Sequence, residues 1–148
     1  MPFVVLRFAN VYGPRQDSKG EAGVVAIFAG AILSGRQPTI YGTGRQTRDF
    51  VFVDDVVEAS LFALKGTQTG IFNIGTGKET TVNEIFSAIK DVTKSSVKKA
   101  YGPARSGEQQ RSCLDYSLAR KKLGWHPRHT LLQGLEKTVE WFKNENHS

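Results

Sequence analysis

Apolar residues along this chain form short β-prone runs that alternate with longer stretches of helical spacing. Strands are predicted at residues 4–8 (VVLRF) and 70–77 (GIFNIGTG), and their nearly continuous apolar character is typical of parallel strands covered on both faces. Helices are predicted at 24–33, which is apolar nearly all round, and at 56–65, where apolar residues recur at helical spacing. Strands that alternate with helices predict an α/β domain.

Residue types suited to helix ends and turns stand between these runs. Thr81 and Glu84 have the spacing of a capping box, so a helix should begin there. Asp54 is predicted to be the N-cap of the helix at 56–65, and Gly66 its C-cap. Asn10, which follows the first strand, opens a predicted turn that runs to residue 16.

Composition narrows the class of protein. At 148 residues, with 39% hydrophobic and 23% charged residues, the chain is expected to form a single globular domain over residues 1–148. Its one cysteine, Cys113, fits a cytoplasmic location and is predicted to be a small buried residue rather than a nucleophile. No apolar run approaches the length of a membrane span, so no membrane partner is expected.

The net charge of +6 favours anionic partners such as phosphorylated metabolites. The basic residues are scattered, and no recognition-helix or aromatic RNA-binding pattern accompanies them, so nucleic acid is not expected. The histidines, His126, His129 and His147, have no Cys or acidic partner at ligand spacing, so no metal site is predicted. The GTG at 75–77 follows a strand, but Thr80 stands where a dinucleotide fingerprint needs its third glycine.

Three polar sites remain as candidates for chemistry. Asn10 ends a parallel-type strand, where ligands bind in doubly wound sheets, although it could instead be a turn residue that caps its own backbone. Arg48 and Asp49 enter a strand from a glycine loop, and Asp49 could simply pair with Arg48 or cap a turn. Arg105 and Glu108 share a loop that could be merely solvated.

Together these side chains indicate a possible site for a nucleotide diphosphate. Arginine donors suit phosphate oxygens, and a diphosphate needs two such groups from different directions. Glu108 can accept hydrogen bonds from ribose hydroxyls, as acidic residues do in dinucleotide folds. Tyr41, on a short predicted strand at 39–41, offers a ring face for a base.

A resemblance to a known family is carried by four segments, in order: LRFANVYGPRQ, IYGTGRQTRDFVFVDDVVEA, GIFNIGTGKETTVNEI and RSGEQQRSCLDYSLARKKLGWHP. They cover essentially the whole chain and resemble the C-terminal half of extended short-chain dehydrogenases. The resemblance is greatest to the NAD-dependent epimerases and dehydratases, and among these to the UDP-glucose 4-epimerases. It implies a C-terminal substrate-binding domain together with the last strands of a truncated Rossmann-type parallel sheet.

The resemblance also implies a UDP-sugar as ligand and a role for individual residues. Asn10, Arg48 and Arg105 would hold the diphosphate, Glu108 the ribose, and Thr39 and Tyr41 the uracil; Val24 would begin a helix packed near the nucleotide, and Phe8 and Ala9 would lie near the nicotinamide of NAD.

The resemblance places the NAD glycine motif and the Tyr-x-x-x-Lys catalytic pair in an N-terminal half that has no counterpart in this sequence. None of the chain's tyrosines is followed by Lys four places on, so no catalytic residue is assigned here. NAD is expected to bind the full-length enzyme rather than this chain alone. A 4,6-dehydratase, a decarboxylase or a non-catalytic nucleotide-sugar-binding fragment remain as alternatives to the epimerase.

The strands at 4–8 and 71–74 carry a further expectation. Both have the composition of strands covered on both faces, and in the family they pair and pack with the N-terminal half. Without that half, apolar surface and strand edges should lie open. The chain is therefore expected to form a homo-oligomer through the exposed sheet.

Overall fold

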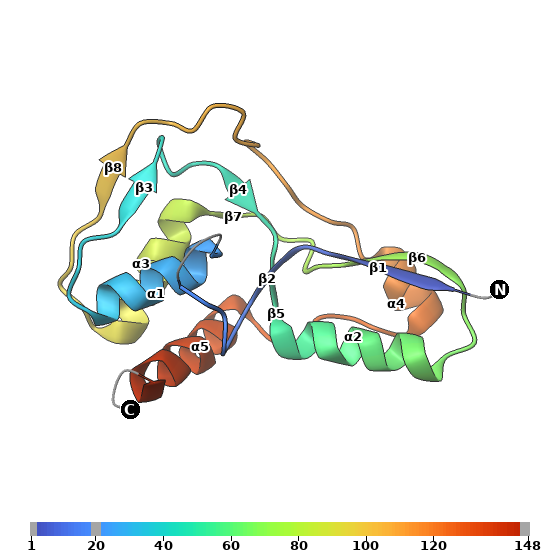
Figure 1. The fold of residues 1–148 in the computed structure, drawn as a ribbon. Coiled ribbons are helices and arrows are strands. Elements are labelled where there is room, and N and C mark those ends of the chain that lie inside the picture. Colours follow the sequence, from blue (N-terminus) through green and yellow to red (C-terminus); the bar gives the residue numbers. More distant parts are fainter. Residues whose placement is uncertain (1–2, 19–21, 146–148) are drawn as a thin grey trace.

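The computed structural model describes residues 3–18 and 22–145, and within them the strands form four two-stranded pairs (Figure 1). The parallel pairs are β1 (Val4–Phe8) with β6 (Gly70–Ile74), β2 (Asn10–Tyr12) with β5 (Phe50–Phe52), and β3 (Thr39–Tyr41) with β8 (Ala100–Gly102). The antiparallel pair is β4 (Thr47–Arg48) with β7 (Thr80–Thr81). The predicted α/β class is confirmed.

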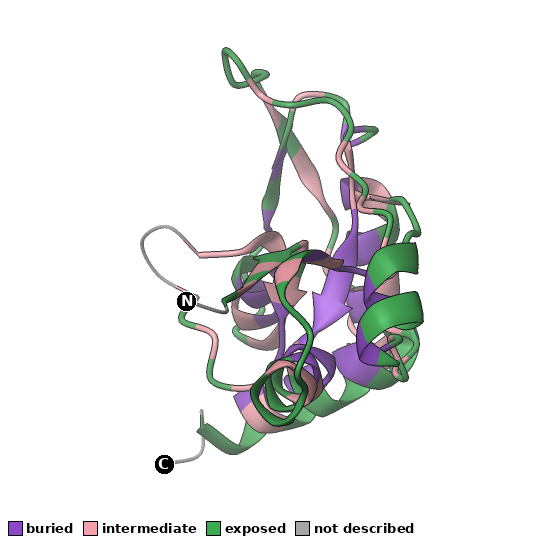
Figure 2. Ribbon diagram, turned by 90° about the vertical axis from the view of Figure 1, so that its right-hand side faces the viewer, coloured by how far each residue is buried: buried purple, intermediate pink, exposed green. Residues whose placement is uncertain are grey.

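The helices of the described residues gather in two groups, which Figure 1 shows on either side of β5. The first group contains α1 (Val24–Leu33), α3 (Val82–Thr93) and α5 (Leu131–Glu145), which contact one another. The second contains α2 (Val53–Lys65) and α4 (Ser117–Leu123), which cover one face of the β1–β6 pair. Each group has its own hydrophobic cluster, and Figure 2 shows the buried residues where helices and strands meet.

The start of α3 follows from local chemistry. The Thr81 hydroxyl accepts a hydrogen bond from the Glu84 N–H at 3.1 Å, and the Glu84 carboxylate accepts one from the Thr81 N–H at 2.7 Å. This is the predicted capping box, and the hydrogen bonds from Thr81 hold the pKa of Glu84 below its ordinary value. The helix then buries Ile85, Phe86 and Ile89 along one face.

Three local predictions are wrong. Residues 10–12 of the predicted turn form β2, because their backbone finds a partner in β5 that lies far away in the sequence. Asp54 is not an N-cap: α2 begins at Val53 after an extended Phe52, and Asp54 lies in the first turn, where negative charge suits the helix dipole. Cys113 is exposed, because it lies in an irregular segment ahead of α4 that does not bury it.

The second face of the β1–β6 pair is open. Leu6 and Phe72 belong to the cluster under α2 and α4, whereas their neighbours Val5 and Ile71, which are opposite each other in the ladder, are 42% and 45% exposed. Phe8 is also exposed, but it alternates with Val5 and so lies on the same face as Leu6. Within the described ranges, each of these two strands pairs only with the other, so the expected open apolar surface and free strand edges are present.

Candidate functional site

The chain changes strand partner between Ala9 and Asn10. The Ala9 N–H donates to the Ile74 carbonyl at 2.9 Å, beside the β1–β6 ladder, and the Asn10 N–H donates to the Asp49 carbonyl at 2.8 Å, where the β2–β5 ladder begins. In α/β sheets, ligands bind in the crevice at the carboxyl ends of strands, where strand order switches. Asn10 lies just after the carboxyl end of β1.

A cavity of about 310 Å³ lies beside Asn10, bounded by the start of α1, by β3 and by the loop after β8. This volume is at the lower end of the range for small-molecule sites. The cavity is lined by all seven residues predicted to bind the nucleotide sugar: Asn10, Val24, Thr39, Tyr41, Arg48, Arg105 and Glu108. Phe8 and Ala9, predicted to lie near a nicotinamide, do not line it.

Two guanidinium groups reach the cavity from different segments. Arg48, on β4, is half-buried, and its Nη1 donates to the Thr47 carbonyl at 2.8 Å. Arg105, on the loop after β8, is exposed, and its Cζ lies 4.2 Å from the centre of the Tyr41 ring, as in a cation–π contact. The pair can bind a diphosphate from two directions. Arg105 covers one face of the Tyr41 ring in this structure.

Glu108 is held by Gln46, a residue that no sequence signal marks. The Gln46 Nε2 donates to Glu108 Oε1 at 3.2 Å and to the Tyr41 carbonyl at 3.0 Å, and Gln46 lines the cavity while being only 6% exposed. A glutamine between Arg45 and Thr47 in a glycine-rich segment is typical of a solvated turn. Its burial depends on tertiary packing.

Asp49 caps a turn, which was one of the simple alternatives for this residue. Its carboxylate is buried and accepts hydrogen bonds from the Thr76 N–H at 2.9 Å, the Gly77 N–H at 3.1 Å and the Leu114 N–H at 3.3 Å. The carboxylate leaves no room for a side chain at residue 75, where a Cβ would lie 2.5 Å from Asp49 Oδ2. The Thr76 and Gly77 N–H groups of the GTG turn are therefore used within the protein.

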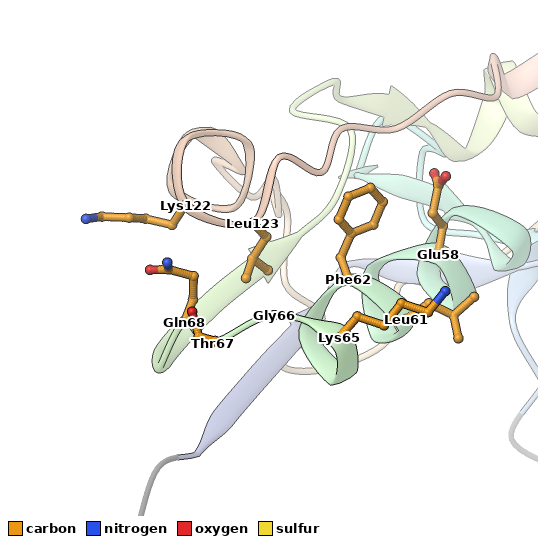
Figure 3. A pocket seen from close by; sticks show the side chains of 9 residues that line it. All are labelled: Glu58, Leu61, Phe62, Lys65, Gly66, Thr67, Gln68, Lys122 and Leu123. Atoms are coloured by element: carbon orange, nitrogen blue, oxygen red, sulfur yellow. The ribbon is translucent and has the colours of Figure 1, made fainter.

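A larger cleft of about 520 Å³ lies at the end of α2, beside α4 (Figure 3). Leu61, Phe62 and Leu123 form its apolar part. Lys65 and Lys122 also line it, but Figure 3 shows their side chains extending in different directions. Because these charges do not converge, the cleft is a poorer phosphate site than the cavity beside Asn10.

Other parts of the described chain offer little chemistry. No group of three His, Cys, Asp or Glu side chains among residues 3–18 and 22–145 is placed to hold a metal ion. His129 instead pairs through Nδ1 with the buried carboxylate of Asp55 at 2.8 Å, which joins α2 to the segment before α5. No helix in the same ranges has the length and apolar character to span a membrane.

Residues 1–75 match the NAD dependent epimerase/dehydratase family. The chain belongs to this family. It is 50% identical over 141 residues to UDP-glucose 4-epimerase of Mycolicibacterium smegmatis, covering 93% of this chain and 44% of that protein. Epimerase-family members named as UDP-glucuronic acid decarboxylases and dTDP-D-glucose 4,6-dehydratases are more distant, at 31% to 34% identity.

Solved structures of family members have the same fold. UDP-glucose 4-epimerase of Thermotoga maritima with UDP-glucose is 49% identical with a TM-score of 0.96, covering 99% of this chain and 47% of that one. UDP-glucose 4-epimerase of Thermus thermophilus, in complex with NAD, is 40% identical with a TM-score of 0.88, covering 97% and 47%. The chain thus spans about half the length of the epimerases it matches.

Proposed function

We propose that the chain is the nucleotide-sugar-binding portion of a UDP-glucose 4-epimerase, and that the cavity beside Asn10 takes the UDP group. The observation that carries this proposal is the convergence of two arginines, a carboxylate, an amide and an aromatic ring on one cavity. Relatives that are half identical to the chain and named as UDP-glucose 4-epimerases support the choice of nucleotide sugar.

Each lining residue then has a part in binding. Arg48 and Arg105 bind the two phosphates, and the Asn10 amide donates to the bridge between them. The Glu108 carboxylate accepts hydrogen bonds from ribose hydroxyls. The remaining contacts are apolar or frame the base: Val24 packs on the nucleotide, and Thr39 and Tyr41 border the uracil.

Tight binding of the nucleotide and diphosphate, with few contacts to the sugar, suits a 4-epimerase. A sugar that must turn within the site has to be held loosely, so the binding energy must come from remote parts of the substrate. The nucleotide and the diphosphate are those parts. Arg48 and Arg105 supply charge-assisted hydrogen bonds, which are about twice as strong as neutral ones.

The residues of this chain do not fit a site for the dinucleotide part of NAD. The turn that most resembles a phosphate loop has its Thr76 and Gly77 N–H groups bonded to Asp49, and Thr80 replaces the third glycine of the fingerprint. We therefore expect NAD to need the longer enzyme of the relatives. There, Phe8 and Ala9, at the end of β1, would keep their predicted place near the nicotinamide.

A 4,6-dehydratase or decarboxylase of the same family is the second candidate. It would use the same anchor for a nucleotide diphosphate, and relatives of both kinds are recognisable at 31% to 34% identity. The higher identity to UDP-glucose 4-epimerases favours the epimerase. A non-catalytic nucleotide-sugar-binding fragment would share the cavity but show no turnover in any context.

Calorimetry of UDP and UDP-glucose with the 148-residue chain tests the proposed site. A specific pocket should keep most of its affinity between low and moderate salt. Binding that any polyanion reproduces, and that falls steeply with salt, would point to non-specific attraction by the +6 charge and would contradict the proposal.

A cytoplasmic location stays a prediction that rests on the single cysteine.

We also propose that residues 1–148 form one domain and that this domain self-associates through the open face of the β1–β6 pair. Val5 and Ile71 expose apolar surface there, beside unpaired strand edges that can recruit another chain. Light scattering at micromolar concentration should show a dimer. Replacing Val5 and Ile71 by lysine should return it to a monomer, whereas a stable wild-type monomer would contradict this proposal.

A further inference from the structure

Gln46 occupies an unusual position for a glutamine. It is nearly fully buried, yet its amide lies in the wall of the cavity and bonds two different parts of it. One bond goes to the carbonyl of Tyr41, at the end proposed for the base. The other goes to the carboxylate of Glu108, at the end proposed for the ribose. One side chain therefore sets the spacing between these two ends.

The backbone of Gln46 is fixed. Its carbonyl accepts a hydrogen bond from the Val82 N–H at 3.2 Å, in the first turn of α3. The next residue, Thr47, pairs with Thr81 in the β4–β7 ladder, and its N–H donates to the Gln110 carbonyl at 2.9 Å. Strand pairing and a helix start thus hold Gln46 in place, independently of its side chain.

Glu108 has backbone support only from its own loop: its N–H donates to the Arg105 carbonyl at 3.3 Å, and its carbonyl accepts from Gln110 Nε2 at 3.1 Å. It lies in the irregular loop between β8 and Arg111. Within the part of the chain that the structure describes, Gln46 is the donor to its carboxylate, and Oε2 has no donor there. The bond to Oε1 therefore fixes the orientation of a carboxylate whose second oxygen can accept from a ligand. A carboxylate is an acceptor only, so its partners in a uridine nucleotide are the ribose hydroxyls or the N–H of the base, and Glu108 lies at the end proposed for the ribose.

We infer that Gln46 is a positioning residue that makes the cavity selective for ribonucleotides over 2′-deoxyribonucleotides, by holding the Glu108 carboxylate against the ribose hydroxyls. The inference rests on the nucleotide site proposed above. It addresses a property that the family leaves open, because relatives include proteins named for both UDP and dTDP sugars. Gln46 acts through Glu108 and does not itself touch the ligand's reacting atoms.

Binding of UDP and of 2′-deoxy-UDP by the 148-residue chain tests this inference. The chain should bind UDP about tenfold more tightly, since a hydrogen bond to a charged group has that value. In Gln46→Met, which keeps the length but has no donor, the ratio should fall to within about twofold through weaker UDP binding, with 2′-deoxy-UDP nearly unaffected. Adding Glu108→Gln to Gln46→Met should change the ratio no further, because the two residues act as one unit.

The control is Gln68→Met, an exposed glutamine beside the larger cleft, which should leave both affinities unchanged. If Gln46→Met weakens both nucleotides equally and keeps the ratio, Gln46 only packs and the inference is wrong. If the wild-type chain binds both nucleotides equally, the inference fails while the proposed site stands. If it binds neither, both fail. Gln46→Asn, too short to reach both partners, replaces Gln46→Met if that variant does not fold.

Discussion

Asp49→Ala should lower the free energy of unfolding by roughly 3–5 kcal/mol, a large part of the total for a domain of this size. Asp49 is only 1% exposed. Its carboxylate accepts hydrogen bonds from three backbone N–H groups and from the Thr76 hydroxyl. Alanine leaves these donors without their acceptor around a buried position, and a buried donor without a partner costs about 1–3 kcal/mol. Thermal unfolding followed by circular dichroism measures the loss.

The matched control is Asp54→Ala. Asp54 is exposed on the first turn of α2, and its contact with Lys137 is long, at 3.5 Å. Surface pairs of this kind contribute at most about 1 kcal/mol. A similar loss of stability in both variants, or none in Asp49→Ala, would show that the GTG turn does not depend on Asp49.

Arg105→Ala should weaken UDP binding by about 1.5–3 kcal/mol, the usual value of a hydrogen bond to a charged group. The guanidinium of Arg105 lies over Tyr41 at the edge of the cavity, so it can contact a diphosphate without moving far. Arg48→Lys should also weaken binding, because an ammonium group cannot make the bidentate contact of a guanidinium. Calorimetry with UDP measures both losses.

Arg45→Ala is the control for these variants. Arg45 is exposed in the same glycine-rich segment as Arg48 but does not line the cavity, so its removal takes away one positive charge and no contact. Its affinity for UDP should match that of the parent chain at moderate salt. Equal affinities for Arg105→Ala, Arg45→Ala and the parent would remove Arg105 from the site.

The elements that the sequence predicts correctly are those with local causes. The helix Val24–Leu33 follows from its apolar run, and the start of α3 from the Thr81–Glu84 capping box. The strand at Asn10–Tyr12 could not be predicted in this way, because its partner is Phe50–Phe52, about forty positions away. Cys113 is exposed for a similar reason: only tertiary packing decides which extended segments are covered.

In the candidate site, too, the sequence predicts the residues with suitable chemistry but not those whose role depends on tertiary contacts. The residue types that suit a nucleotide diphosphate, selected by the family resemblance, are those of Asn10, Arg48, Arg105 and Glu108. The structure shows that these four residues line one cavity. Their contacts with a ligand stay predictions. The sequence could not predict the role of Gln46 in the site, because that role depends on two hydrogen bonds, to the Tyr41 carbonyl and to Glu108, that form only in the folded chain. The part played by Asp49 likewise depends on Thr76, Gly77 and Leu114.

The central claim is that the nucleotide binds in the cavity beside Asn10 rather than in the larger cleft at the end of α2. Nuclear magnetic resonance of the isotopically labelled chain, titrated with UDP, tests it most directly. The claim predicts that the largest amide shifts lie at Tyr41, Arg48 and Arg105, with little change between residues 61 and 68. Shifts concentrated at residues 61–68, or no saturable shifts at all, would contradict it.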